Sequence, residues 1–267
     1  INQLVEQAIE KANFPRINLI AYSNAPGLAP CLNVGQRKAL ELSKSLNIPL
    51  IPVNHVLAHL FSAHQFTKAK DPLYIFTSGA NTQIIIKDKN HFRILGETLD
   101  IGLGNALDKF GRSLQIPFPA GPEIEKLAKK GKYTELPYTI KGMDLTFSGV
   151  ITAAENQFKK GISKQDLSYS LQETLFSMLT EVTERALAYT KKEHVVLIGG
   201  VAANQRLIEM LGVMCKSRNS KLYTVPIEYA GDQAVMIAYT GLLLYKNKII
   251  RKPEIEPYQR VDEIRWI

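Results

Sequence analysis

Two histidines and a late aspartate are the side chains of this sequence best suited to hold a metal ion. His55 and His59 lie four residues apart in NHVLAH, and this spacing puts both imidazoles on one face of a helix. Asp232 begins the last predicted helix, where a carboxylate could complete a two-histidine metal site. Structural histidines and a helix-capping aspartate would fit the same pattern. A zinc protease is excluded, because Val56 stands where such a site needs a glutamate as general base.

Two turns of small residues could bind the phosphates or the base of a nucleotide. SGANTQ, residues 78–83, lies between two strand-like runs, and small residues there let backbone N–H groups approach a phosphate. In IGGVAANQR, residues 198–206, a buried strand passes through a Gly-Gly turn to a helix N-terminus, which suits an anion or a stacked base. The second turn is not a GxGxxG fingerprint, so a dinucleotide-binding Rossmann domain is not indicated. Taken alone, each turn also fits an ordinary connection.

Acidic residues lie between these turns in GETLDIGLGNALDKFGR, residues 96–112. Glu97, Asp100 and Asp108 stand there beside glycines, and acids next to glycine loops can hold a metal or accept from ribose hydroxyls. The alternative is that Asp100 caps a helix and Asp108 is solvated. The residues themselves leave both possibilities open.

An alternation of helices and strands must position the paired histidines. Apolar spacing predicts helices at 1–13, 35–46 and 54–66, the last with Asn54 as its N-cap, and strands at 17–22 and 48–53. The Gly- and Pro-rich SNAPGLAPCLNVG predicts a loop over 23–35. Alternating elements of this kind favour a parallel sheet layer.

The pattern changes near Lys70, which divides an N-terminal α/β lobe, 1–70, from a C-terminal α/β lobe, 71–267. The runs LYIFTS, TQIIIKD and HFRILGETL are separated by turn signals and predict antiparallel hairpins. A mainly helical insertion is expected at about 117–165. The other predicted elements are helices at 104–115 and 163–190, a buried strand VVLI, a helix from Ala202, a strand at 222–225 and a helix at 231–245.

Composition places the chain among soluble globular proteins. It has 267 residues, 45% hydrophobic and 22% charged, and no apolar run is long enough to span a bilayer, so no membrane partner is expected. The polar, amphipathic start is unlike a signal peptide, and the two cysteines are few enough to favour a reducing cytoplasm. The net charge of +8 suits an anionic partner such as nucleic acid, as well as a generally basic surface.

Taken together and in order, these motifs resemble the universal tRNA threonylcarbamoyltransferases. This family is known in bacteria as TsaD and in archaea and eukaryotes as the catalytic subunit of the KEOPS complex. The resemblance runs from about Asn18 to Leu244, and the Leu57-Ala58 pair and KGMDLTFSG look archaeal. The phrases that carry it are PGLAPCLNVG, NIPLIPVNHVLAH, SGANTQ, GETLDIGLGNALDKFGR, PAGPEIEKLA, KGMDLTFSG, LQETLFSMLTEVTERAL, IGGVAANQRL and GDQAVMIAYTG.

The resemblance implies an actin/Hsp70/sugar-kinase-like two-lobe α/β fold with a helical insertion. Its first lobe would be incomplete at the N-terminus, because the sequence begins after the family's first strand hairpin. The implied activity transfers threonylcarbamoyl from threonylcarbamoyl-adenylate to the exocyclic amine of the adenosine 3′ of the anticodon in tRNAs reading ANN codons. The implied partners are tRNA, a RIO-type small kinase and a dimerising subunit of a KEOPS-like complex, with the N-terminal lobe helices as the surface for the dimerising subunit.

The resemblance also implies the site residues. One divalent metal, iron or zinc with magnesium or manganese as alternatives, would be held by His55, His59 and Asp232. No general base is identified. The positions that match the family's contacts to an adenine nucleotide or to threonylcarbamoyl-adenylate are Phe76, Thr77, Ser78, Gly79, Ala80, Asp108, Gly121, Glu125 and Asn204.

Several positions depart from the family pattern, and two other functions compete with the first. Phe76 stands where some archaeal relatives have a metal-contacting tyrosine, Ala80 and Ala120 replace glycines, and Gln233 replaces an asparagine. A catalytically silent scaffold paralogue is one alternative, although the known bacterial scaffold lacks the two-histidine, one-aspartate set. A small-molecule kinase of the same fold is the other, and the long family-specific phrases argue against it.

Overall fold

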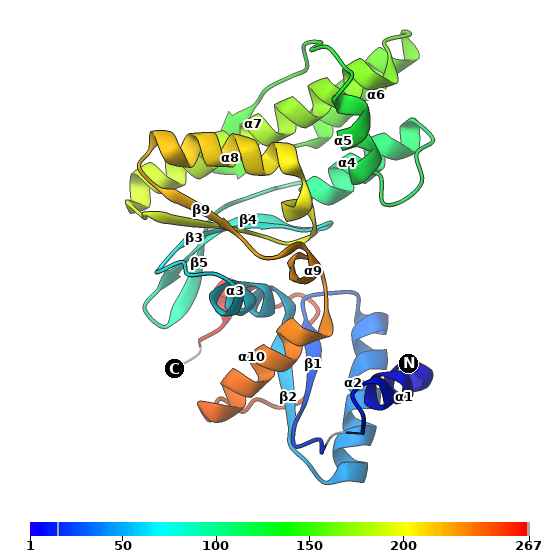
Figure 1. Cartoon of the computed structure of the whole chain (residues 1–267), viewed down its shortest axis with the longest axis vertical. Coiled ribbons are helices and arrows are strands. Elements are labelled where there is room, and N and C mark those ends of the chain that lie inside the picture. The colour runs from blue at the N-terminus through cyan, green and yellow to red at the C-terminus, as the bar shows by residue number, and fades with distance from the viewer. Residues whose placement is uncertain (15, 266–267) are drawn as a thin grey trace. The chain divides into compact units, whose positions relative to one another are not determined.

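The computed structural model describes residues 1–14 and 16–265, which form two compact units (Figure 1). The first unit consists of Ile1–Ser62 and Gln233–Ile267, and the second of Ala63–Asp232. The division therefore differs from lobes at 1–70 and 71–267, because the end of the chain returns to the first unit. In the described part of the chain, no helix is both long and apolar enough to cross a membrane.

The first unit is built on two parallel strands. Strand β1, Ile20–Ala25, pairs with β2, Leu50–Asn54, as the alternating pattern predicts. Helix α10, Ala234–Lys246, packs against both strands because Gly241 has no side chain, and a Cβ there would lie 2.5 Å from the Cβ of Ala21. The small core of this unit contains Ile51, Val53, Ala58, Met236 and Leu244.

A side-chain cap fixes the start of helix α3 but not that of α1. Helix α1 spans Asn2–Lys11, and α3 spans His55–Phe66 into the start of the second unit. The Oδ1 atom of Asn54 accepts a hydrogen bond from the Leu57 N–H at 3.1 Å, which confirms the predicted N-cap.

The predicted loop over 23–35 is wrong. Strand β1 continues to Ala25, and helix α2 spans Ala29–Leu46, with a proline in its first turn. Proline favours the first turn because its ring presets the helical φ and no N–H is needed there. The Gly- and Pro-rich letters therefore mark a short connection and a helix start.

The second unit contains a five-stranded sheet in the order β5-β4-β3-β8-β9. Strands β3, β4 and β5 are antiparallel, which confirms the predicted hairpins, whereas β8 and β9 run parallel to β3. All five residues of β3 are buried at the centre of the sheet. The strands are β3 (Leu73–Thr77), β4 (Thr82–Asp88), β5 (His91–Glu97), β8 (His194–Ile198) and β9 (Lys221–Thr224).

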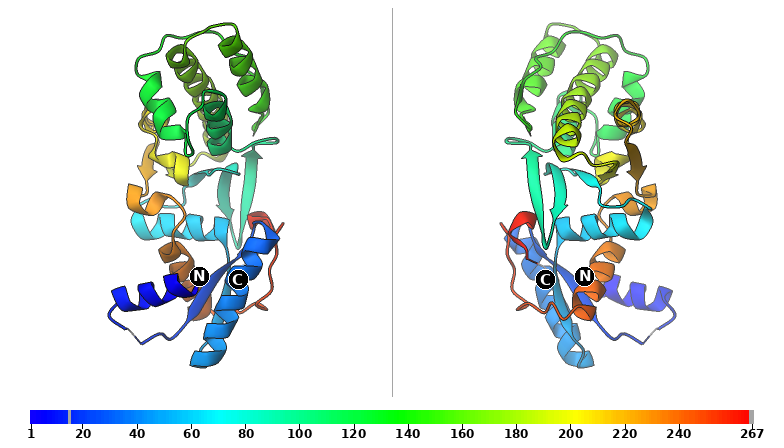
Figure 2. Two further views of the ribbon diagram at one scale, coloured as in Figure 1. Left: turned by 90° about the vertical axis from the view of Figure 1, so that its right-hand side faces the viewer. Right: turned by 90° about the vertical axis from the view of Figure 1, so that its left-hand side faces the viewer.

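Helices stack on one face of this sheet (Figures 1 and 2). Helix α7 is the central one, and Leu171, Leu175, Phe176 and Leu179 on it are fully buried. In the sequence, α5, the short hairpin of β6 and β7, and α6 follow α4 and precede α7. The elements are α4 (Leu103–Ser113), α5 (Gly121–Ala128), β6 (Ile140–Lys141), β7 (Asp144–Leu145), α6 (Ser148–Lys159), α7 (Lys164–Thr190), the 3-10 helix η1 (Gly200–Ala203), α8 (Gln205–Ser217), α9 (Ile227–Ala230) and the 3-10 helix η2 (Val261–Glu263).

Candidate functional site

The turn between β3 and β4 is closed on itself but leaves backbone donors exposed. The Ser78 N–H donates to the Asn81 carbonyl at 2.8 Å, and the Ser78 Oγ accepts from the Asn81 N–H at 3.0 Å. Gly79 and Ala80 at its tip are exposed, and their N–H groups donate to no acceptor among the described residues. Two adjacent unpaired N–H groups are suited to bind an anionic oxygen.

The first turn of helix α4 holds this turn in place through hydrogen bonds. The N–H groups of Gly104 and Asn105 donate to the carbonyls of Ser78 and Gly79 at 3.1 and 2.9 Å. A Cβ at Gly102 would lie 2.4 Å from the carbonyl carbon of Ala80, so only glycine permits this contact. Asn105 was not among the predicted site residues, although it lies in the GLGNALD phrase within the first turn of α4.

The end of β8 lies beside the end of β3. Thr77 donates through Oγ1 to the Ile198 carbonyl at 3.2 Å. Gly199 has φ +98, and a Cβ on it would lie 2.3 Å from the Thr77 carbonyl oxygen. The two turns predicted to bind a nucleotide therefore leave neighbouring parallel strands at the same edge, where open α/β sheets bind ligands.

Asn204 is buried and serves as the N-cap of α8. Its Oδ1 accepts from the Leu207 N–H at 3.1 Å, and its Nδ2 donates to Gln172 Oε1 at 3.3 Å. The helix expected from Ala202 instead begins as the 3-10 turn η1 and becomes α-helical at Gln205. The side chain thus fixes the position of this turn through both of its polar atoms.

Two of the predicted acids hold neighbouring elements together with one oxygen each. Asp108 Oδ1 accepts from the Ala120 N–H at 2.7 Å, which ties α4 to the start of α5 at Gly121. Glu125 Oε1 accepts from the Gln205 N–H at 3.0 Å, which ties α5 to α8. No partner is recorded within the described residues for the second oxygen of either carboxylate, so both keep an acceptor available.

Asp100 is structural. Its carboxylate accepts from the backbone N–H groups of Ile101, Phe147 and Ser148 at 2.7, 3.0 and 2.8 Å. Burial raises the pKa of Asp100, but the hydrogen bonds from Phe147, Ser148 and Ile101 outweigh it, and the pKa is lowered overall. The predicted capping role is therefore correct in kind, although the helix it caps is the distant α6.

His55 and His59 lie together on α3, with ring centroids 4.9 Å apart in an edge-on arrangement. Asp232 directly precedes Gln233, where the chain re-enters the first unit. One ligand atom from each of these three residues lies within 4.8 Å of the others. Gln233 Oε1 caps α10 by accepting from the Met236 N–H at 2.9 Å, so Asp232 is not the cap of that helix. Two imidazoles and a carboxylate fit a divalent transition metal.

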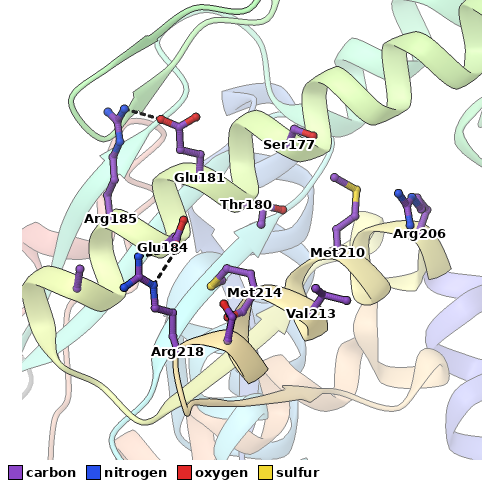
Figure 3. A pocket seen from close by; sticks show the side chains of 12 residues that line it. Ser177, Thr180, Glu181, Glu184, Arg185, Arg206, Met210, Val213, Met214 and Arg218 are labelled. Atoms are coloured by element: carbon purple, nitrogen blue, oxygen red, sulfur yellow. Dashed lines mark hydrogen bonds and ion pairs between the residues drawn. The ribbon is translucent and has the colours of Figure 1, made fainter. Parts of the chain in front are cut away.

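A hollow of about 790 Å³ between α7 and α8 contains none of the predicted site residues (Figure 3). Its charged side chains are all paired: Glu181 with Arg185, Glu184 with Arg218, and Arg206 with two glutamates outside the hollow, Glu173 and Glu209. Paired charges leave little attraction for a charged ligand, and we do not assign the site here.

Comparison with known proteins identifies relatives over the whole chain. The sequence profile of the family described as tRNA N6-adenosine threonylcarbamoyltransferase matches residues 1–239. The chain is 48% identical to the tRNA N6-adenosine threonylcarbamoyltransferase of Archaeoglobus fulgidus, over 98% of this chain and 83% of that protein. It is also 48% identical to a "Probable bifunctional tRNA threonylcarbamoyladenosine biosynthesis protein" of Methanocaldococcus jannaschii, covering 99% of this chain and 51% of that protein.

A solved structure shares the fold. Full-length HypF in its phosphate- and nucleotide-bound form superposes with a TM-score of 0.67 at 15% sequence identity, covering 97% of this chain and 42% of HypF. HypF from T. kodakarensis gives a TM-score of 0.65 at 16% identity. At these identities the likeness establishes a mixed α/β fold of this type and nothing about activity.

Proposed function

Because the chain belongs to the tRNA N6-adenosine threonylcarbamoyltransferase family, we propose that it modifies tRNA with threonylcarbamoyl-adenylate as donor. The acceptor is the exocyclic amine of the adenosine 3′ of the anticodon in tRNAs that read ANN codons. The chain acts as the catalytic subunit of a KEOPS-like complex in the cytoplasm. Its fold is the two-lobe actin/Hsp70/sugar-kinase type.

The observation that carries this proposal is the pair of exposed, unpaired N–H groups at Gly79 and Ala80. They bind the phosphate of the adenylate, and α4 holds them in place through the carbonyl groups of the same turn. Fixed backbone donors stabilise negative charge without reorganising. This matters here because the phosphate becomes the leaving group.

The carboxylates of Asp108 and Glu125 supply the next part of the site. Each uses one oxygen to fix its own position, and the second accepts from a ribose hydroxyl of the nucleotide. Gly121 at the start of α5 and Asn204 at the N-cap of α8 complete the proposed site, with the buried Phe76 and Thr77 at the end of β3. Together these residues orient an adenylate at the edge of the second unit's sheet.

His55, His59 and Asp232 hold one divalent metal ion. Imidazole ligands favour iron or zinc over magnesium or manganese, which prefer oxygen ligands. A metal bound there supplies a Lewis acid for the oxygens of the donor. His59 is 1% exposed, so its ring is fixed by its surroundings. Phe76 offers no hydroxyl ligand and is fully buried.

In the transfer, the adenine amine attacks the carbamoyl carbon of the donor. A C–N bond forms, the C–O bond to the phosphate breaks, AMP leaves and the amine proton passes to solvent. The adenine amine is a weak nucleophile, so much of the rate comes from holding the two substrates in contact. The residues of the second unit do this for the donor, and we assign no general base.

A RIO-type kinase and a dimerising subunit are the proposed protein partners. The chain corresponds to about half of a relative named as bifunctional, which suits a second activity that works beside this one. The proposed surface for the dimerising subunit contains an apolar hollow of about 290 Å³ between α1 and α2. The hollow is lined by Val5, Ala8, Ile9, Ala12, Ile17, Ile20, Leu42 and Leu46. Cys31 and Cys215 are both free thiols, which suits a reducing cytoplasm.

Adenine-nucleotide binding and metal content together test the proposal. We expect the wild-type chain to carry about one metal per subunit by mass spectrometry and to bind ATP in calorimetry. His55→Ala/His59→Ala should lose the metal, whereas His91→Ala on β5 should keep it. Ala80→Pro removes one phosphate donor and should weaken ATP binding about tenfold, while Ala80→Ser, which keeps the N–H, should not.

The remaining outcomes separate the alternatives. Transfer of threonylcarbamoyl to tRNA after addition of the partner subunits would complete the case. A chain that binds neither metal nor nucleotide would be a silent scaffold. A chain that binds ATP and phosphorylates sugars or acetate, without modifying tRNA, would be a kinase of the same fold.

A further inference from the structure

One face of α4 is exposed and polar along its length. Asn105, Lys109 and Arg112 follow one another at spacings of four and three residues, and all three are exposed. The opposite face of the helix is buried in the core, with Leu107 and Phe110 at most 3% exposed. The helix therefore presents a stripe of one amide and two cations to solvent.

The two cations of this stripe have no acidic partner. No ion pair or hydrogen bond joins Lys109 or Arg112 to another side chain among the described residues. Asp108 lines the same cavity as both cations, and one of its oxygens is held by the Ala120 N–H at 2.7 Å. Unpaired cations beside one engaged carboxylate leave positive charge in excess, which attracts phosphate.

An exposed aromatic ring lies beside these cations. Phe118 is 84% exposed, and it lines a cavity of about 350 Å³ together with Ile101, Asn105, Asp108, Lys109 and Arg112. A phenylalanine so exposed gains nothing from the core of this chain. Its flat face is available for stacking against a nucleic-acid base.

The loop that carries Phe118 is tied to α4 and to the start of α7. The Ile116 N–H donates to the Gly111 carbonyl at 2.8 Å, and Lys164 Nζ donates to the Leu114 carbonyl at 2.8 Å. With the Asp108 bond to Ala120, these contacts fix both ends of the loop that carries Phe118. The ring and the cations are therefore presented together, without an ordering cost on binding.

We propose that Lys109, Arg112 and Phe118 bind the anticodon loop of the tRNA next to the modified adenosine. The cations bind backbone phosphates, and the ring stacks on an unpaired base, which is how proteins bind single-stranded loops of RNA. Asn105 joins this surface to the donor site, because its N–H donates to the Gly79 carbonyl at 2.9 Å. The inference rests on the proposed function, since the transfer requires RNA to lie beside the adenylate.

The salt dependence of tRNA binding tests the two cations. The full chain is titrated into a labelled transcript of a tRNA that reads an ANN codon, at a series of salt concentrations, by fluorescence anisotropy. We expect Lys109→Gln/Arg112→Gln to make the slope of log affinity against log salt shallower by about two. Lys246→Gln/Lys248→Gln removes equal charge from the end of α10 and should leave the slope nearly unchanged. Equal slopes for both double variants would overturn the proposal.

The stacking role of Phe118 is tested by removing its aromatic ring and by replacing it with a larger one. Phe118→Ala should weaken tRNA binding about tenfold, as loss of one stacked base does, whereas Phe118→Trp should retain it. Unchanged binding by Phe118→Ala, or loss of a partner subunit in place of tRNA, would count against an RNA surface here. Calorimetry with ATP separates the RNA surface from the donor site. If Lys109→Gln/Arg112→Gln and Phe118→Ala bind both ATP and tRNA as the wild type does, the RNA surface is refuted and the donor site is unaffected.

Discussion

At the residue scale, carboxylates that look alike in the sequence have different roles in the structure. Asp100 and Asp108 stand in one phrase and both could contact a ligand. The structure commits Asp100 to three backbone N–H groups, but Asp108 to one. Two of the three donors to Asp100 come from the start of α6, far along the chain, and no local pattern could have identified them.

Gly199 offers a sharp test at this scale. We expect Gly199→Ala to lower the free energy of unfolding by about 2 kcal/mol or more, because a Cβ at φ +98 would lie 2.3 Å from the Thr77 carbonyl oxygen. Urea denaturation followed by circular dichroism measures it. ATP affinity should fall as well, because relief of the clash displaces the end of β3.

The neighbouring glycine is the matched control. A Cβ at Gly200 would meet nothing within 4 Å, so Gly200→Ala should leave both stability and ATP binding near the wild-type values. Equal losses in the two variants would show that the close approach of β8 to Thr77 does not matter.

At the scale of elements, signals that are local in sequence were predictable and those that depend on a distant partner were not. The Asn54 cap of α3 and the hairpins of β3, β4 and β5 are encoded within a few residues. The start of α2 at Ala29 was missed because glycine and proline on its N-terminal side suggested a loop. Asn204, expected at a ligand, is fixed by a side chain of α7 as well.

The cap of α3 governs the helix that carries both histidines. Asn54→Ala should lower the free energy of unfolding by about 1 kcal/mol, because the Leu57 N–H loses its acceptor. Metal affinity should fall with it, because His55 lies in the first turn of the helix. Thermal denaturation and zinc titration by calorimetry give the two quantities.

Replacement by another capping residue separates the cap from other contacts of the side chain. Asn54 Nδ2 also donates to the backbone carbonyl of Gln259 at 3.3 Å. Asn54→Ser keeps the cap and loses this donor, so it should retain most of the metal affinity. If Asn54→Ser were as weak as Asn54→Ala, the bond to Gln259 would be the important contact.

At the scale of the whole molecule, the two units differ in how the chain builds them. The second unit is continuous from Ala63 to Asp232, whereas the first needs both ends of the chain. The sequence predicts the last helix but not the sheet on which that helix packs. The return of α10 to β1 and β2 could therefore not be predicted.

The continuous unit should fold by itself. We expect a fragment of residues 63–232 to unfold in a single cooperative transition and to bind ATP, because it contains the turn at 78–80, both acids proposed to bind the ribose and its own large core. Differential scanning calorimetry and ATP titration measure this. A fragment of residues 1–232 should lose the fold of the first unit, because Ile51 and Val53 lose the apolar cover of Met236 and Leu244. Failure of 63–232 to fold, with 1–232 intact, would contradict both expectations.

Because the first unit is formed by two segments that are separated in the sequence, its folding must follow an order during synthesis. As the ribosome releases the chain, β1, α2 and β2 emerge first but must wait for α10, while the second unit can complete itself in between. His55 and His59 precede the second unit in the chain, and Asp232 is the last residue of that unit. The proposed metal ion would therefore meet its full set of ligands only after the whole second unit has been synthesised, so we expect metal loading to follow the folding of that unit.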